Sequence, residues 1–447
     1  MLGFIFVFVA FFAICACALT RPWVGIVGFY GFVMLEPEWN WRWSLPPDFG
    51  FQKWIFACLL IGWVINGFPG QSLRGWPGVA CAAFAGFLGL AWISSQQSID
   101  PVLSEFFMDN MWKIVVTAIL AVRLLDAPHK IWAMLWTVSI AHGYNAYGIT
   151  REYLDLGWCQ YVYKTHWAWE GSNQVANLAV CASAASLALL FYAPKTWQKG
   201  VAGLIFLLQA HQVMLLESRG CMLGMIGLAA TAVILMPKTR VNIRMVVLAT
   251  IGVGMLAGPS VVEQFQSIFV AEDQLDTSAD SRKKLWKAGA AITADYPLLG
   301  VGPLASERLV PLYYEGGLTT KQKALHNLVF EISTGSGILP TLLYFSFFLI
   351  PGIRAFLLMR RPAVHQFAPP ALQAALFAAS AGLGGFLIAN QFSAGALMEG
   401  SYTLAATGLA AILVTQRAFQ AAPTVAVTQR RARGFGDAPL NPKPLPS

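Results

Sequence analysis

Apolar runs of about 17–25 residues recur along almost the whole chain, and each is long enough to cross a bilayer as an α-helix. Short polar turns separate them, and the strict apolar–polar alternation typical of a membrane β-barrel is absent from the sequence. The pattern predicts an all-α polytopic membrane protein with about 12–13 transmembrane helices and one large extracytoplasmic loop, which is periplasmic if the membrane is a bacterial inner membrane. The predicted spans are 1–19, 22–36, 51–67, 77–95, 112–125, 131–148, 174–193, 200–217, 220–236, 245–262, 327–351, 371–391 and 396–416.

Composition supports the membrane class. Of the 447 residues, 57% are hydrophobic and only 12% are charged, whereas soluble domains carry roughly 25% charged residues. The mean hydropathy is +0.58. The net charge of +8 is explained by Lys and Arg in loops on one side of the membrane, so we predict no nucleic-acid partner.

The distribution of basic residues sets the predicted orientation. Lys195, Lys238 and Arg360 fall in short loops on one side, which we predict to be cytoplasmic. The opposite side then holds the longest polar stretch. The predicted segments are N-terminal transmembrane helices at 1–111, a transmembrane core at 112–262, the large periplasmic loop at 263–326, C-terminal transmembrane helices at 327–416 and a disordered cytoplasmic tail at 417–447.

Within the large loop, Asp280 predicts the start of a helix over residues 281–294 as its N-cap. One face of that helix would be lined by Leu285, Ala288, Gly289 and Ile292. A glycine-containing tight turn is expected after it.

His326 is the strongest candidate for chemistry, because a neutral imidazole suits proton acceptance near neutral pH. It stands where the large loop meets the next predicted helix. The alternative interpretation is an interfacial histidine that hydrogen-bonds the helix start. Asn327, directly after it, could orient the ring or a sugar hydroxyl, or cap the helix.

Two arginines are candidates for anion binding. Arg219 lies in a very short turn at the predicted outer surface, where it either meets an anion or anchors the turn by snorkelling. Arg282, on the predicted loop helix, offers a guanidinium fork for phosphate oxygens, or else belongs to a solvated charged face. The sequence has neither a Walker loop nor an HExxH motif, so we predict no metal and no cofactor.

These residues fall into an ordered set of short motifs. The set comprises Ser218-Arg219-Gly220 at the start of a span, Arg282 followed by Trp286, Asp295-Tyr-Pro-Leu-Leu-Gly-Val-Gly302, and His326-Asn327 followed by Gly335 and Gly337. In this order they resemble the O-antigen ligase/polymerase superfamily of bacterial inner-membrane glycosyltransferases, over roughly residues 170–415. The first hundred residues look like the branch of exosortase-associated O-glycosylation ligases.

The resemblance implies transfer of a preassembled glycan from undecaprenyl pyrophosphate to an acceptor hydroxyl at the periplasmic side of the inner membrane. It implies inversion at the anomeric carbon without a metal. His326 would be the general base, and Arg219 and Arg282 would hold the pyrophosphate, with Asn327 contacting substrate. The acceptor stays open between a lipid, a protein and a glycan. A repeat-unit polymerase is the first alternative function, and a polytopic transporter or flippase is a more distant one.

Overall fold

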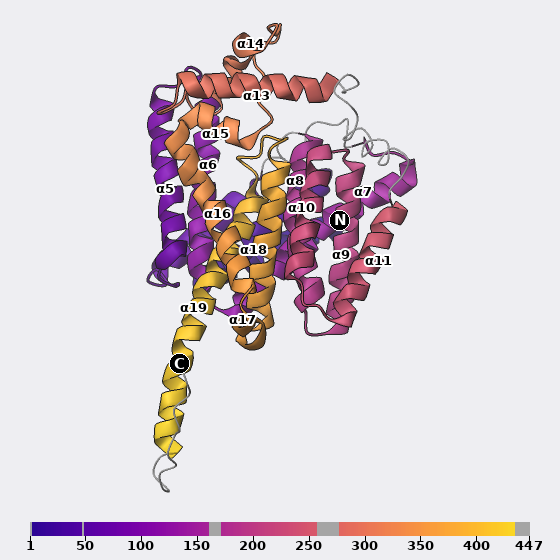
Figure 1. Cartoon of the computed structure of the whole chain (residues 1–447), viewed down its shortest axis with the longest axis vertical. Coiled ribbons are helices and arrows are strands. Elements are labelled where there is room, and N and C mark those ends of the chain that lie inside the picture. Colours follow the sequence, from indigo (N-terminus) through magenta and orange to yellow (C-terminus); the bar gives the residue numbers. More distant parts are fainter. Residues whose placement is uncertain (1, 47–48, 161–170, 257–276, 434–447) are drawn as a thin grey trace, which may run out of the picture.

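The computed structural model describes residues 2–46, 49–160, 171–256 and 277–433, and every regular element in these ranges is a helix. Most of the helices stand side by side in one bundle (Figure 1). The predicted all-α polytopic membrane fold is therefore confirmed. The elements of the first half are α1 (Leu2–Thr20), α2 (Pro22–Leu35), α3 (Pro37–Asn40), α4 (Phe51–Ile65), α5 (Gly75–Gln96), α6 (Pro101–Leu124), α7 (Pro128–Leu156), α8 (Ser172–Tyr192), α9 (Thr196–Leu215), α10 (Arg219–Leu235) and α11 (Arg240–Leu256).

The second half begins with a helix of different orientation, α13, which lies across one end of the bundle (Figure 1). We call this the α13 end. The remaining elements are α13 (Thr277–Asp295), the 3-10 helix η3 (Ala305–Arg308), α14 (Val310–Tyr313), α15 (Leu328–Ser336), α16 (Ile338–Met359), α17 (Pro362–Phe367), α18 (Pro370–Ala389) and α19 (Glu399–Arg433). Each predicted span has a helix in the structure; residues 257–262, at the end of the tenth span, lie outside the described ranges.

Five of the described helices are long and apolar enough to cross a membrane by length and composition alone. They are α1, α5, α8, α16 and α18. The α8 helix is wholly buried inside the protein, whereas α1 presents bulky side chains such as Phe6 and Phe12 outward. A helix that is apolar all round fits either surrounding, protein or lipid.

Close backbone contact holds the centre of the bundle together. The α18 helix packs against both α8 and α10. A Cβ atom added at Gly224 of α10 would lie 2.7 Å from the carbonyl oxygen of Gly385 in α18. Small residues at such a crossing let two helices approach closely, which is a common way for membrane helices to associate where lipid supplies little hydrophobic driving force.

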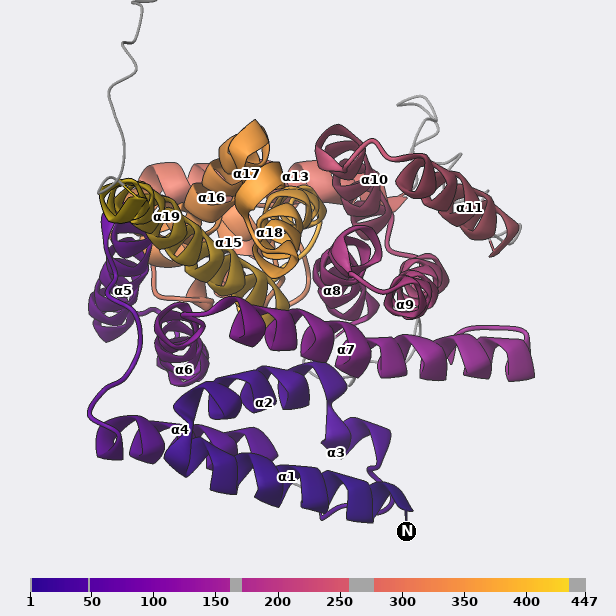
Figure 2. The same cartoon turned by 90° about the horizontal axis from the view of Figure 1, so that it is seen from below.

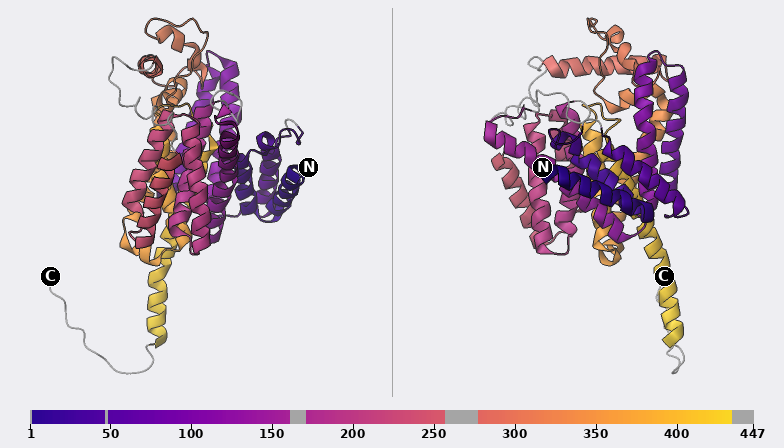
Figure 3. Two further views of the ribbon diagram at one scale, coloured as in Figure 1. Left: turned by 90° about the vertical axis from the view of Figure 1, so that its right-hand side faces the viewer. Right: turned by 180° about the vertical axis from the view of Figure 1, so that it is seen from behind.

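The first four helices form a separate layer. Seen from below, α1, α2, α3 and α4 lie on one side of α6 and α7, and the rest of the bundle lies on the other (Figure 2). They project from one flank of the molecule in the side view (Figure 3). The predicted boundary between residues 111 and 112 falls inside the continuous helix α6.

The start of α6 also corrects a sequence prediction. Residues 96–111 separate the predicted spans 77–95 and 112–125 and are therefore predicted to form a loop, but the helix begins at Pro101. Asp100 caps it by accepting a hydrogen bond from the backbone N–H of Leu103 (3.2 Å), and proline is well suited to the first helical position. The hydropathy pattern did not predict the start of this helix, because its first turns contain the exposed polar residues Glu105 and Asp109.

Two further predictions fail at helix ends. The span expected over 327–351 is broken into α15 and α16 at Gly337, whose φ of +95° is a conformation that favours glycine. The tail predicted to be disordered from residue 417 continues α19 as far as Arg433, since this stretch is rich in Ala, Gln and Arg, which favour helix. Residues 434–447 lie outside the described ranges.

Candidate functional site at the α13 end

A small satellite core fixes α13 over the end of the bundle. Leu285 and Ile292 of α13 pack with Val310 and Leu325, separately from the main core. The predicted apolar face of this helix is therefore confirmed, although the helix begins at Thr277, before the expected cap at Asp280. Residues 263–276 of the predicted loop lie outside the described ranges. The satellite core places the chain just before His326 under α13.

His326 has an uncommon backbone conformation. Its φ is +50°, a region that non-glycine residues enter rarely and that carries a conformational cost. The side chain is half-buried. Burial, and then the positive charges of Lys323 and Arg282, lower the pKa of His326 to about 4. The imidazole is therefore neutral at physiological pH, the form that accepts a proton.

Asn327 holds the backbone that follows His326. Its Oδ1 atom accepts hydrogen bonds from the backbone N–H groups of Val329 (2.9 Å) and Phe330 (3.2 Å), so it is the N-cap of α15. Its Nδ2 atom donates to both the backbone oxygen and the side-chain Oε1 of Gln391, each at 3.2 Å. Of the roles considered from sequence, the cap is the one seen here, and it fixes the direction in which the chain leaves His326.

Arg282 acts electrostatically on groups from two distant parts of the chain. Its charge affects the imidazole of His326, and it also acts on the thiol of Cys221 in α10. Arg282 is half-buried on α13. Arg282 and His326, 44 positions apart in the sequence, thus belong to one electrostatic neighbourhood.

Arg219 begins a helix that an aromatic ring ties to α13. It is the first residue of α10, half-buried, and Gly220 follows it. A Cβ atom at Gly220 would meet Phe392, with the closest atom at 2.6 Å. The ring of Phe392 in turn packs against Trp286, one turn along α13 from Arg282, with centroids 5.6 Å apart. Phe392 therefore ties the first turn of α10 to α13.

The tight turn that follows α13 is docked onto the break between α15 and α16. The backbone N–H of Val301 donates to the oxygen of Thr334, and that of Gly302 donates to the oxygen of Gly335, both at 3.0 Å. Ser94 of α5 donates to the oxygen of Gly335 at 2.8 Å. The turn after α13 and the Gly335 segment that follows His326 are thus hydrogen-bonded to each other, although they are separated in the sequence.

Gly300 in this turn supports a stability prediction. Its φ is +65°, and an added Cβ would overlap the backbone of Thr334 and Gly335. We expect Gly300→Ala to cost about 3 kcal/mol or more. Gly316→Ala is the matched control, since Gly316 also has positive φ (+90°) but open space around it; it should cost only about 1 kcal/mol. Thermal unfolding midpoints in detergent would test this, and equal shifts for the two variants would contradict the docking.

The sequence did not identify the loop after α18 as part of the site. Besides the contacts of Gln391 and Phe392, the oxygen of Asn390 accepts from the backbone N–H of Leu328 at 2.9 Å. The carboxylate of Glu331 accepts from the backbone N–H of Gly395 at 3.1 Å. The only available signal was a polar Asn-Gln pair at the end of an apolar run, and it gave no indication of partners some sixty positions away.

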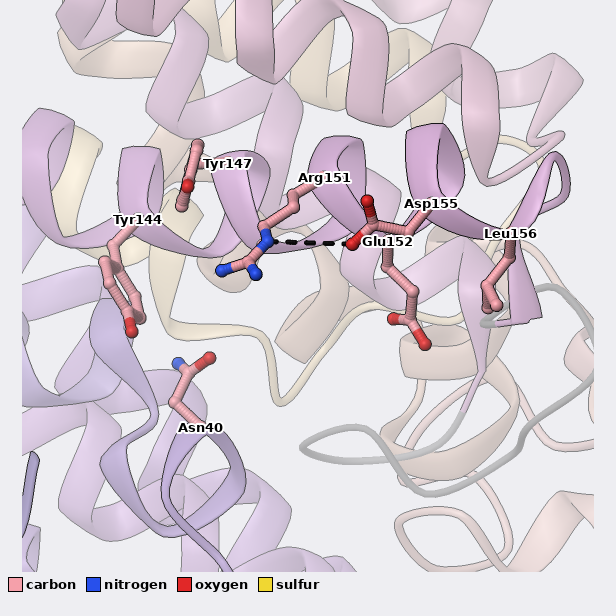
Figure 4. Close-up of a pocket in the computed structure, with 8 residues that line it drawn as sticks. Asn40, Tyr144, Tyr147, Arg151, Glu152, Asp155 and Leu156 are labelled. Atoms are coloured by element: carbon pink, nitrogen blue, oxygen red, sulfur yellow. Dashed lines mark ion pairs between the residues drawn. The ribbon is translucent and has the colours of Figure 1, made fainter. Parts of the chain in front are cut away.

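A separate polar pocket of about 380 Å³ lies between α3 and the end of α7 (Figure 4). Arg151 and Asp155, one turn apart on the α7 wall of the pocket, form an ion pair at 3.6 Å, and both side chains are exposed. Exposed pairs of this kind contribute little to stability. None of the site residues predicted from sequence lines this pocket, so we assign it no part in the site.

The described architecture is that of an all-α membrane protein with a cationic, histidine-containing site under a helix that crosses one end of the bundle. Residues 204–345 match the family model described as O-antigen ligase. The matched segment contains Arg219, Arg282, His326 and Asn327. The resemblance to the O-antigen ligase superfamily is thereby confirmed, and this segment belongs to that family. A comparison with curated proteins finds no match. The match associates the chain with membrane glycan-ligase or polymerase activity; the exosortase-associated branch stays a prediction.

Proposed function

We propose that the protein is a glycan ligase that transfers a preassembled glycan from undecaprenyl pyrophosphate to an acceptor hydroxyl at the periplasmic face of the bacterial inner membrane. The observation that carries the proposal is a neutral, partly buried histidine within reach of the charge of Arg282 on α13, with the first turn of α10, which Arg219 begins, tied to the same helix through Phe392. All of these except Phe392 lie in the segment that matches the O-antigen ligase family. A base and a pair of cations are what this reaction requires of the protein.

In the proposed reaction, the acceptor oxygen attacks the anomeric carbon of the donor while the bond from that carbon to the pyrophosphate oxygen breaks. His326 takes the proton of the acceptor hydroxyl, and undecaprenyl pyrophosphate leaves with the bonding electron pair. Attack opposite the leaving group inverts the anomeric centre. Arg219 and Arg282 stabilise the negative charge that develops on the pyrophosphate. Because pyrophosphate is already a good leaving group, the proposal needs no metal.

Burial, together with the two cationic neighbours Lys323 and Arg282, gives the activity of His326 a pH dependence that can be measured. Since its pKa is lowered to about 4, the neutral base persists down to that pH, and the acid limb of kcat/KM should lie near pH 4 rather than near 6.5. Bound pyrophosphate would offset the positive charges, so the limb of kcat should lie at higher pH. Lys323→Met should move the kcat/KM limb upward. A limb near pH 6.5 in the wild type would contradict the assignment.

The proposed activity is tested with purified protein reconstituted into liposomes and supplied with undecaprenyl-pyrophosphate-linked glycan from the host. We expect release of undecaprenyl pyrophosphate together with glycosylated product, and the same rate in the presence of a chelator. Gel electrophoresis then separates the two related functions, since single-length additions indicate a ligase and a ladder of lengths indicates a polymerase. No release with any acceptor fraction would overturn the proposal.

A further inference from the structure

A second cavity, larger than the pocket of Figure 4, lies between the N-terminal layer and the loop that supports His326. Its volume is about 650 Å³, within the size range typical of small-molecule sites. The walls come from α2, α3, α4, α6 and α8 and from the start of α19. In every one of these helices except α6, the lining residues lie within two turns of a helix end. These ends are on the side of the bundle where α3 and the loop before α19 lie.

The lining combines aromatic rings with charged and amide groups. Trp39, Phe56 and Trp112 supply flat apolar faces, while Asn110 and Glu399 supply hydrogen-bonding groups. Phe56 and Trp112 also pack together, with ring centroids 6.0 Å apart. A cavity for an acyl chain would have an apolar lining, because a carboxylate or amide buried against hydrocarbon loses its hydration. A sugar ring fits this lining, because its apolar faces can pack on the aromatic rings and its hydroxyls can hydrogen-bond the polar side chains.

Glu399 is the lining residue with the strongest indication of a ligand. It is partly buried at the first position of α19, and no side chain in the described part of the chain forms an ion pair with it. Its own backbone N–H, at the start of α19, hydrogen-bonds the carboxylate. An ionisable side chain within a membrane protein is expected to serve a function when no oppositely charged partner accounts for it. A carboxylate accepts hydrogen bonds from sugar hydroxyls without requiring a charged ligand.

The cavity and the candidate base share one structural support. Gln391 binds the Asn327 side chain that caps the helix after His326, and Met398 and Glu399, a few residues later, line the cavity. The loop after α18 thus has the His326 segment on one side and the cavity on the other.

We propose that this cavity binds the sugar portion of the acceptor, with Trp112 against a face of the ring and Glu399 and Asn110 accepting or donating hydrogen bonds to its hydroxyls. The inference rests on the proposed function and narrows the acceptor to a sugar-bearing molecule rather than a hydroxyl of a protein side chain. The loop after α18 would then hold the acceptor sugar beside the base that removes its proton.

The first test separates acceptor binding from donor binding. In liposomes with the host's undecaprenyl-pyrophosphate-linked glycan as donor and a total glycolipid extract of its membranes as acceptor, Glu399→Gln should raise the acceptor amount needed for half-maximal rate about tenfold. The half-saturating donor concentration should stay unchanged. Glu105→Gln is the matched control, because Glu105 is exposed on α6 outside the cavity. An effect on the donor alone, or no effect, would overturn the inference.

The second test does not depend on turnover, so failure of the proposed function would not be confused with failure of this inference. The photo-crosslinker p-benzoylphenylalanine replaces Phe56 in the cavity or, as control, the exposed Trp54 on the same helix. After irradiation with the same glycolipid extract, mass spectrometry of the labelled peptide should find sugar-containing adducts at position 56 well above those at 54. Adducts with polypeptide or with acyl chains only, or equal labelling at the two positions, would overturn the assignment.

Discussion

His326→Ala is expected to lower the rate of glycan transfer by a factor of about 10² to 10⁴, the contribution typical of a general base. The variant should insert and fold normally, because Asn327 and the loop after α18 fix the backbone around position 326 without using the imidazole. The measurement is the initial rate of glycosylated product in liposomes at saturating donor.

The matched control for this variant is His129→Ala. His129 lies at the start of α7, close to Trp23 at the start of α2 (5.8 Å between ring centroids), and takes no part in the α13 end. Its replacement should leave the transfer rate unchanged. Removal of a general base is expected to lower the rate at least about a hundredfold. If His326→Ala retains more than about a tenth of the wild-type rate, His326 is not the base.

Replacing either arginine is the second change with a large expected effect. Arg282→Ala and Arg219→Ala should each reduce kcat by a factor of about 10² to 10³, as when one donor to a developing negative charge is removed. The lysine variants should recover only part of this loss, because an ammonium group has no planar fork for two phosphate oxygens. The measurement is kcat at saturating acceptor.

Arg308→Lys is the matched control for the lysine variants. Arg308 belongs to the same polar region, but its guanidinium pairs with Asp100 at 2.6 Å, and lysine keeps the charge of that pair. Its kcat should match the wild type. Arginine-to-lysine variants at 219 and 282 that behave like this control would remove the pyrophosphate assignment.

Much of the fold could be predicted from the sequence because hydropathy reports lipid and core contact directly. Hydropathy does not predict a helix where the helix carries an exposed polar face. The first turns of α6 include Glu105 and Asp109, and they were therefore predicted to be a loop. The break at Gly337 was also missed. The hydropathy pattern does not indicate this break, because the apolar run continues through it. A single residue with positive φ separates α15 from α16.

The site was predictable to the extent that its residues form short local motifs. Arg219, Arg282 and His326 could be selected because each is a charged or titratable group at a predicted surface boundary. Their common neighbourhood could not be derived, since it depends on Phe392 packing between α10 and α13 and on Gln391 holding Asn327. Those contacts join segments whose separation in the sequence carries no local pattern.

The central claim is a division of labour, with the arginines binding pyrophosphate and His326 moving the proton. Equilibrium binding of undecaprenyl pyrophosphate to the purified wild type, Arg282→Ala, Arg219→Ala and His326→Ala tests it most directly. We expect affinity at least about tenfold weaker for both arginine variants, because a charge-assisted contact is lost. For His326→Ala we expect affinity close to that of the wild type. Equal loss in all three variants, or no loss in the arginine variants, would contradict it.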